Sequence, residues 1–346
     1  MLAKLQHDHN ICMIKEQMSM LTTIIFDILA CKDTIEKAEK FLVDLKKHQL
    51  TYYLLSDLQA QKLQALPFSY IPKIIGCMPE QLIFISQNAT NLNLAKEAGL
   101  MTIAYTPQQE FLPSLYCFES FSDIDSRYLI HVWHRYQHIP ISRFTTKHLE
   151  IRELCALDLP RLFKIYQEPG IDTYMEELHQ DYSIFTEKMQ AYINQIYPLY
   201  DFGMWGVFLK GSNILIGECG IHQVTIDNNI EIEIGYLLST KYQKKGYGRE
   251  MVRATLKYAN KTYDFQTIIA QIMRGNHSSI KLAEHCGFVY KKKCKKNGKV
   301  LYQYEWNYAM QAQRARELAK KTVKSVFSDH RVYKKRYHKK SEIDLP

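Results

Sequence analysis

A short loop in the C-terminal half combines glycines with cations, in the segment "YQKKGYGREM" from Tyr242 to Met251. Gly246 and Gly248 stand directly before an amphipathic stretch that predicts a helix. Amide groups in the first turn of a helix have no intrahelical partner, and glycine lets an anion approach them closely. The segment lacks the spacing of a P-loop or of a dinucleotide fingerprint. It therefore predicts a pyrophosphate-binding turn, to which the lysine and arginine side chains add positive potential.

Carboxylates that could accept a proton lie in the strand-like stretch just before this loop. Alternation in "IEIEIGY" puts Glu231 and Glu233 on one strand face and isoleucines on the other. A carboxylate on such a face is a candidate general base, and Glu233 is favoured because it lies nearer the strand centre. For Glu231, a solvent-facing or cation-paired role fits the pattern equally well. Glu218 and His222 share a face of the preceding strand and are candidates for lining an acceptor site.

These motifs resemble a known family. The stretches "GYLLSTKYQKKGYGREMVRATLKYA" and "IIAQIMRGNHSSIKLAEHCGFVYKKK" are similar to the acetyl-CoA-binding core of GNAT N-acetyltransferases, above all the Rim-type branch that acetylates protein N-termini. The resemblance covers about 148–307. It implies a cofactor, acetyl-CoA, whose pyrophosphate lies on the loop and whose pantetheine arm runs beside the strand at 230–238, as an added strand would. The residues that it implies for cofactor binding are Leu237, Leu238, Gln243, Lys244, Lys245, Gly246, Tyr247, Gly248, Arg249, Asn276 and Ser279.

The family's usual proton donor is missing from its expected position. In the family, a tyrosine on the helix that follows the CoA-contacting asparagine, here Asn276, normally protonates the leaving thiolate. The residue at the matching position in this sequence is Ala283. Rim-type members commonly lack this tyrosine, and a serine is proposed in its place. The resemblance therefore assigns this role to Ser279, although a serine there can equally be a helix cap. The implied catalytic residues are Glu233, Glu231 and Ser279.

The N-terminal part resembles a second family, the haloacid-dehalogenase-like (HAD) phosphatases. In "IIFDILACKDT", Asp27 matches the nucleophilic aspartate, and Ser56 matches the phosphate-binding serine that ends the next strand. The general acid is replaced by Leu29, and the metal-binding acids of the last motif appear as Gln87 and Asn88, with Asn91 beyond. Without a metal, a carboxylate nucleophile would meet an unscreened phosphate. The resemblance thus implies a catalytically inactive HAD-like domain.

Alternating strand and helix patterns predict an α/β protein with two domains. The expected fold class is an N-terminal HAD-like doubly wound parallel sheet followed by a GNAT mixed α/β domain. We expect a flexible N-terminus at 1–20, the HAD-like domain at 21–120, a helical linker at 121–147, the GNAT domain at 148–308, and a basic, partly helical tail at 309–346. Asn297-Gly298 predicts a tight hairpin near the end of the GNAT domain.

Composition constrains the surroundings of the protein. Eight scattered cysteines without a C-x-x-C pair fit reduced thiols, and no segment reads as a signal peptide or membrane span, so we expect a cytoplasmic protein without membrane contact. Of the net charge of +9, the tail from Met310 carries eleven Lys/Arg against four Asp/Glu. Contact of this tail with RNA or the ribosome is one interpretation, and a solvated extension is another.

We expect no metal, since neither "HDHNIC" nor the histidines at 131, 134 and 138 matches a common site.

The sequence therefore predicts an acetyl-CoA-dependent N-acetyltransferase that acts on a primary amine. A protein N-terminus is the first choice of acceptor, and a small amine or amino-sugar is the second. One alternative is a non-catalytic adaptor that binds CoA, RNA or the ribosome. A HAD-type phosphatase, or a fusion that transfers glyceryl units, is a lesser alternative because Leu29 removes an acid that both need.

Overall fold

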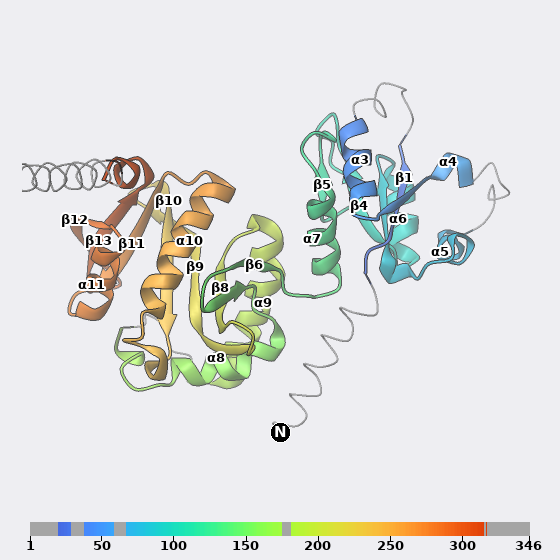
Figure 1. The fold of residues 1–346 in the computed structure, drawn as a ribbon. Helices are drawn as coiled ribbons and strands as arrows, with labels where there is room; N and C mark the ends of the chain where they lie inside the picture. Colours follow the sequence, from blue (N-terminus) through green and yellow to red (C-terminus); the bar gives the residue numbers. More distant parts are fainter. Residues whose placement is uncertain (1–19, 29–37, 59–66, 175–180, 315, 317–346) are drawn as a thin grey trace, which may run out of the picture. The chain divides into compact units, whose positions relative to one another are not determined.

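The computed structural model describes residues 20–28, 38–58, 67–174, 181–314 and 316 (Figure 1). They fall into two compact units. The N-terminal unit comprises the residues up to Ile141 together with Cys155–Leu157. The C-terminal unit comprises Ser142–Leu154 and the residues from Asp158 onwards.

The N-terminal unit is built on a five-stranded sheet with the order β2-β1-β3-β4-β5, in which all pairs are parallel. Its strands are β1 (Thr23–Asp27), β2 (Thr51–Leu54), β3 (Leu82–Ser86), β4 (Met101–Tyr105) and β5 (Cys117–Phe118). Its helices are α3 (Glu39–Lys47), α4 (Leu55–Leu58), α5 (Ile71–Ile75), α6 (Ala89–Glu97) and α7 (Ser126–Tyr136), with 3-10 turns η2 (Phe68–Tyr70) and η3 (Pro79–Gln81).

Helices cover both faces of this sheet. Ile24 and Phe26 of β1 pack in a cluster with residues of α3 and α7, whereas Ile25 packs with residues of α4 and α6. A strand buried on both faces reads as a continuous apolar run, which is why "TIIF" lacks alternation. The parallel α/β sheet expected from the sequence is present.

The C-terminal unit has an eight-stranded sheet with the order β12-β13-β11-β10-β9-β8-β7-β6, mixed because only β10 and β11 run parallel. Its strands are β6 (Ser142–Thr145), β7 (Leu149–Arg152), β8 (Met204–Leu209), β9 (Ile214–Ile226), β10 (Asn229–Leu238), β11 (Thr267–Met273), β12 (Val289–Lys296) and β13 (Lys299–Asn307). Its helices are α8 (Leu159–Tyr166), α9 (Tyr182–Tyr200), α10 (Tyr247–Tyr263) and α11 (His277–His285), and the chain adds 3-10 turns η4 (Ala156–Asp158), η5 (Asp172–Tyr174) and η6 (Thr240–Tyr242).

The helices of this unit divide between the two faces of its sheet. Ile234 and Leu238 of β10 lie in a core cluster with apolar residues of α10 and α11. Leu237, which points to the opposite face, lies in a cluster with residues of α8 and α9. Side chains at odd positions of β10 therefore face α8 and α9, and those at even positions face α10 and α11.

The structure corrects two expectations and confirms a third. The segment expected as a helical linker, 121–147, is divided: α7 packs in the core of the N-terminal unit, and β6 is an edge strand of the second sheet. Strand β2 ends at Leu54, so Ser56 is an exposed residue of α4 and does not end the strand. The hairpin at Asn297-Gly298 joins β12 to β13 as predicted, with φ of 50° and 75° at these residues.

Several sequence motifs lie outside the described residues, including "HDHNIC", Leu29 and nearly all of the basic tail. Within the described ranges, no helix is long and apolar enough to cross a membrane. The same ranges hold no cluster of three His, Cys, Asp or Glu side chains arranged to bind a metal.

Candidate active site

The glycine loop adopts a left-handed backbone just before α10. Gly246 is the N-cap of this helix with φ 90°, and Lys244 has φ 59°. Only glycine takes a φ such as that of Gly246 without strain, which explains the residue type there. The first backbone bond of α10 runs from Glu250 N to Gly246 O at 3.1 Å. The amides of the residues between them precede this bond and are available to an anion.

Gly248 has a different physical role from Gly246. A Cβ atom built on Gly248 would lie 3.2 Å from Leu282 Cδ2, whereas one on Gly246 would meet nothing within 4 Å. Gly248 thus lets the start of α10 pack closely against α11. One glycine sets the turn of the loop, and the other sets the approach of two helices.

Neighbouring side chains hold the loop in place. Gln243 Nε2 donates to Leu238 O at 2.9 Å. Glu168 accepts from Ser239 Oγ at 2.8 Å and from Thr240 N at 2.7 Å. Burial on its own would raise the pKa of Glu168, but these hydrogen bonds outweigh it and hold the pKa below its ordinary value. Sequence reasoning missed Glu168, because no local signal links it to a loop about 70 residues away.

Glu250, the first acidic residue after the loop, directs its carboxylate away from the loop. Glu250 accepts hydrogen bonds from Thr146 Oγ1 at 2.6 Å and from His148 N at 2.9 Å. Its carboxylate is therefore bound to the β6–β7 turn. This arrangement keeps a negative charge away from the anion site predicted at the start of α10.

A cavity of about 880 Å³ opens where β10 and β11 separate. The two strands share one registered pair, Glu233 with Ile269. Beyond it, residues of both strands line the cavity, so the backbone of β10 from Ile234 onward faces open space on this side. Two cations, Lys244 of the loop and Arg249 of the first turn of α10, line it as well.

One wall of this cavity, formed by β9 and β10, carries two carboxyl groups and an imidazole. Glu218 and His222 come from β9, and Glu233 comes from β10, paired directly with His222. Glu233 Oε1 accepts from Gln271 N at 3.0 Å, and Glu233 Oε2 lies 3.6 Å from His222 Nε2. The other ring nitrogen, His222 Nδ1, is buried with no hydrogen-bond partner in the described part of the chain.

Glu218 is the buried carboxyl of this wall, with 4% of its surface exposed. Burial raises its pKa to about 7, although the hydrogen bond that it accepts from Tyr166 and the nearby His222 act in the opposite direction. A carboxyl with such a pKa exchanges its proton near neutral pH.

Glu218 should make the stability of the protein fall as the pH rises. Its pKa is about 7 in the folded protein and ordinary in the unfolded chain, so between these values only the folded state keeps the proton. The free energy of unfolding should decrease through this window by up to about 3 kcal/mol and then level off. Glu218→Gln should remove this component. Urea denaturation at about pH 5 and about pH 8 measures it; parallel pH dependence in wild type and variant would contradict the assignment.

Most residues that the sequence assigned to the cofactor line the cavity. They are Leu237, Leu238, Gln243, Lys244, Gly246, Gly248, Arg249, Asn276 and Ser279. The side chains of Lys245 and Tyr247 are not among the lining residues: Lys245 Nζ lies 5.5 Å from the ring centroid of Tyr242, and the Tyr247 ring lies 6.1 Å from that of His148. Glu231 is not a lining residue either, although it shares a strand face with Glu233.

Asn276 Oδ1 caps α11 by accepting from Ser279 N at 3.1 Å.

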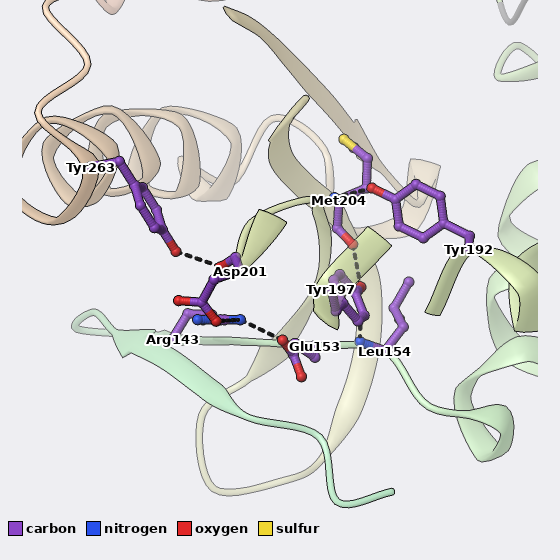
Figure 2. A network of polar contacts seen from close by, with 8 residues as sticks. All are labelled: Arg143, Glu153, Leu154, Tyr192, Tyr197, Asp201, Met204 and Tyr263. Carbon is purple, nitrogen blue, oxygen red and sulfur yellow. Dashed lines mark hydrogen bonds and ion pairs between the residues drawn. The ribbon is translucent and has the colours of Figure 1, made fainter. Parts of the chain in front are cut away.

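A network of tyrosines fixes the strand that forms one edge of this wall (Figure 2). Met204, a lining residue at the start of β8, donates its amide to Tyr192 Oη at 2.8 Å, and its carbonyl accepts from Tyr197 Oη at 2.5 Å. Leu154 N donates to the same Tyr197 hydroxyl at 3.2 Å. Helix α9 is thereby tied to the start of β8 and to the segment that follows β7.

A buried ion pair completes this network. Arg143 pairs with Glu153 and, at 3.0 Å, with Asp201 Oδ1, and the hydroxyl of Tyr263 donates to Asp201 O at 2.6 Å (Figure 2). These contacts join β6, the end of α9 and the end of α10. They position the framework and do not reach the cavity.

Comparison with known proteins finds similarity in the C-terminal unit. The acetyltransferase (GNAT) domain matches residues 148–289. The protein YkkB of Bacillus subtilis is 28% identical over 165 residues, which cover 47% of this chain and 95% of YkkB. The N-acetyltransferase p20 of Bacillus licheniformis is 26% identical over 149 residues, 41% of this chain and 80% of p20. A GNAT-family acetyltransferase structure from Bacillus anthracis is 24% identical, with a TM-score of 0.41, and covers 47% of this chain and 96% of that protein.

The cavity has the features that acetyl-CoA requires. The amides at the start of α10 and the cations Lys244 and Arg249 suit a pyrophosphate. The open edge of β10 suits an extended arm that pairs with main chain. GNAT acetyltransferases use acetyl-CoA. Residues 148–289 therefore contain a GNAT acetyltransferase domain, and this chain is an acyltransferase enzyme with acetyl-CoA as its cofactor.

Proposed function

We propose that the C-terminal unit transfers the acetyl group of acetyl-CoA to a primary amine. The observation that carries this proposal is that one cavity is lined both by the cationic, amide-rich loop and by a wall with Glu218, His222 and Glu233. The loop suits the anionic end of the donor, and the acidic wall suits an amine that arrives as a cation. The resemblance to Rim-type enzymes makes a protein N-terminus the first choice of acceptor and a small amine the second.

Glu233 is the proposed general base. Its carboxylate is held in place by the amide of Gln271 on one oxygen and lies near His222 with the other. Acetyl-CoA supplies an activated acetyl thioester when bound. Glu233 would take the proton that the attacking amine must lose, directly or through a water, as the carbon–nitrogen bond forms. His222 would orient that carboxylate.

The test is a screen of amines for release of free CoA thiol from acetyl-CoA. The panel contains peptides with free N-termini, the same peptides with blocked N-termini, and small amines. We expect thiol release with at least one free amine and none with the blocked peptides. Binding of acetyl-CoA without release by any member of a broad panel would favour the non-catalytic adaptor.

We also propose that the N-terminal unit is a phosphatase-like scaffold without phosphatase activity. Asp27 ends β1, an interior strand between β2 and β3, and the register pairs it with Ser86 of β3. Ser86 Oγ donates to Asp27 Oδ2 at 2.7 Å, and Asn91 Nδ2 donates to the same oxygen at 2.8 Å. Neutral donors thus hold the carboxylate that a phosphatase would use as nucleophile. Release of phosphate from an aryl phosphate in the presence of Mg²⁺ would contradict this proposal.

A further inference from the structure

Two hydroxyl groups meet on the cavity wall at the start of α11. Ser279 Oγ donates to Tyr236 Oη at 2.9 Å, and Tyr236 Oη lies 3.2 Å from Ser279 O, to which it donates. Both residues line the cavity. Tyr236 comes from β10 and Ser279 from α11, so the pair connects the strand with the helix that covers it.

This pair stands close to the position where a proton donor was expected and not found. Ala283 follows Ser279 by one helical turn, is fully buried, and lies in the core cluster against which Tyr236 packs. Alanine contributes no ring there. The phenol of Tyr236 reaches the same helix face from the strand below it.

The location of Tyr236 on β10 separates it from the acidic wall. Even positions of β10 face α10 and α11, and odd positions, including Glu233, face α8 and α9. The phenol and the carboxylate therefore lie on opposite faces of one strand, beside the opening between β10 and β11. A thioester seated in this opening can be approached by a base from one face and by a proton donor from the other.

The surroundings of Tyr236 keep its phenol protonated. Burial is the main cause that raises its pKa well above the ordinary value, and the nearby Cys286, Cys219 and Tyr304 add to the effect. The hydrogen bond from Ser279 acts in the opposite direction. A protonated phenol beside a site where negative charge develops on sulfur can donate a hydrogen bond to it. Because its raised pKa makes it a weaker acid than a thiol, the phenol passes on its proton only as Ser279 Oγ supplies another.

We propose that Tyr236 is the proton donor to the leaving sulfur and that Ser279 positions and reprotonates it. This inference rests on the proposed acetyl transfer. As the carbon–nitrogen bond forms, the carbon–sulfur bond breaks and its electron pair goes to sulfur, which receives the phenol proton. Tyr236 regains a proton from Ser279 Oγ, which already donates to it, and Ser279 regains one from water. The proton lost by the amine leaves through Glu233.

The experiment measures the pKa of the thiol of bound CoA, which requires no acceptor. The ultraviolet absorbance of the thiolate is titrated in the CoA complex, and the titration of the protein alone is subtracted. We compare wild type with Tyr236→Phe, Ser279→Ala and Tyr258→Phe. The last variant removes a phenol that packs against the same core cluster but does not line the cavity.

If Tyr236 donates to the sulfur, the thiol pKa should rise by about one to two units in Tyr236→Phe, the size expected for loss of a hydrogen bond to a charged group. It should stay at the wild-type value in Tyr258→Phe and rise less in Ser279→Ala. A larger rise in Ser279→Ala than in Tyr236→Phe would make the serine the donor and overturn the inference. Equal thiol pKa values in all complexes would overturn it too. Failure of the wild type to bind CoA would overturn the proposed function with it.

Discussion

Replacing Glu233 by glutamine should lower kcat for acetyl transfer by about 10²- to 10⁴-fold, the usual contribution of a general base. Glutamine keeps an oxygen that can accept the hydrogen bond from Gln271 N, so the geometry of the β10–β11 opening should survive. The affinity for acetyl-CoA should change little, because the anion-binding loop lies beyond the C-terminal end of β10, whereas Glu233 lies near the centre of that strand. Steady-state kinetics of thiol release, together with calorimetric titration of acetyl-CoA, separate these two quantities.

Glu231→Gln is the matched control. It removes the same charge from the same face of the same strand, but Glu231 does not line the cavity. Its kcat should remain within about threefold of the wild-type value, as expected for a surface substitution. Equal losses in the two variants would indicate a general effect of charge. Full activity in Glu233→Gln would move the base to Glu218 or His222.

Replacing Gly246 by glutamate should weaken acetyl-CoA binding by about 100-fold or more, since a carboxylate a few ångströms from a pyrophosphate costs several kcal/mol near a protein surface. A side chain at φ 90° adds backbone strain, which disturbs the turn that presents the amides of α10. Isothermal titration with acetyl-CoA measures the loss. ATP, a triphosphate without a pantetheine arm, serves as the comparison ligand and should bind weakly to both proteins.

Gly211→Glu is the control for this substitution. Gly211 also has a left-handed backbone, with φ 74°, and a Cβ there would meet nothing within 4 Å. It lies in the turn between β8 and β9, outside the cavity lining. Its variant carries the same strain and charge but should bind acetyl-CoA normally. Weak binding in both variants would attribute the effect to stability, and normal binding in Gly246→Glu would remove the loop from the donor site.

Local sequence signals predicted the elements because the physics behind them is local. Apolar runs such as "TIIF" and "LIFI" are buried on both faces of a parallel sheet, and Asn297-Gly298 takes the positive φ angles that a tight hairpin needs. The division of 121–147 between two cores was missed. Whether a helix is a linker or a core element depends on the surface against which it packs. Helix α7 buries Leu129 and Trp133 in a cluster that includes residues of β1 and β3, far upstream in the chain.

The sequence by itself determined the chemistry that is available: a glycine turn with cations, alternating carboxylates, and an alanine where a phenol was expected. Strand periodicity put Glu231 and Glu233 on one face, but it could not decide which of them meets the cavity. The tertiary structure decided that, because β10 and β11 separate just after Glu233. It also brought Tyr236 to Ser279 and Glu168 to Ser239, pairs that lie 43 and 71 residues apart. Such contacts depend on how strands and helices pack, and no local pattern encodes them.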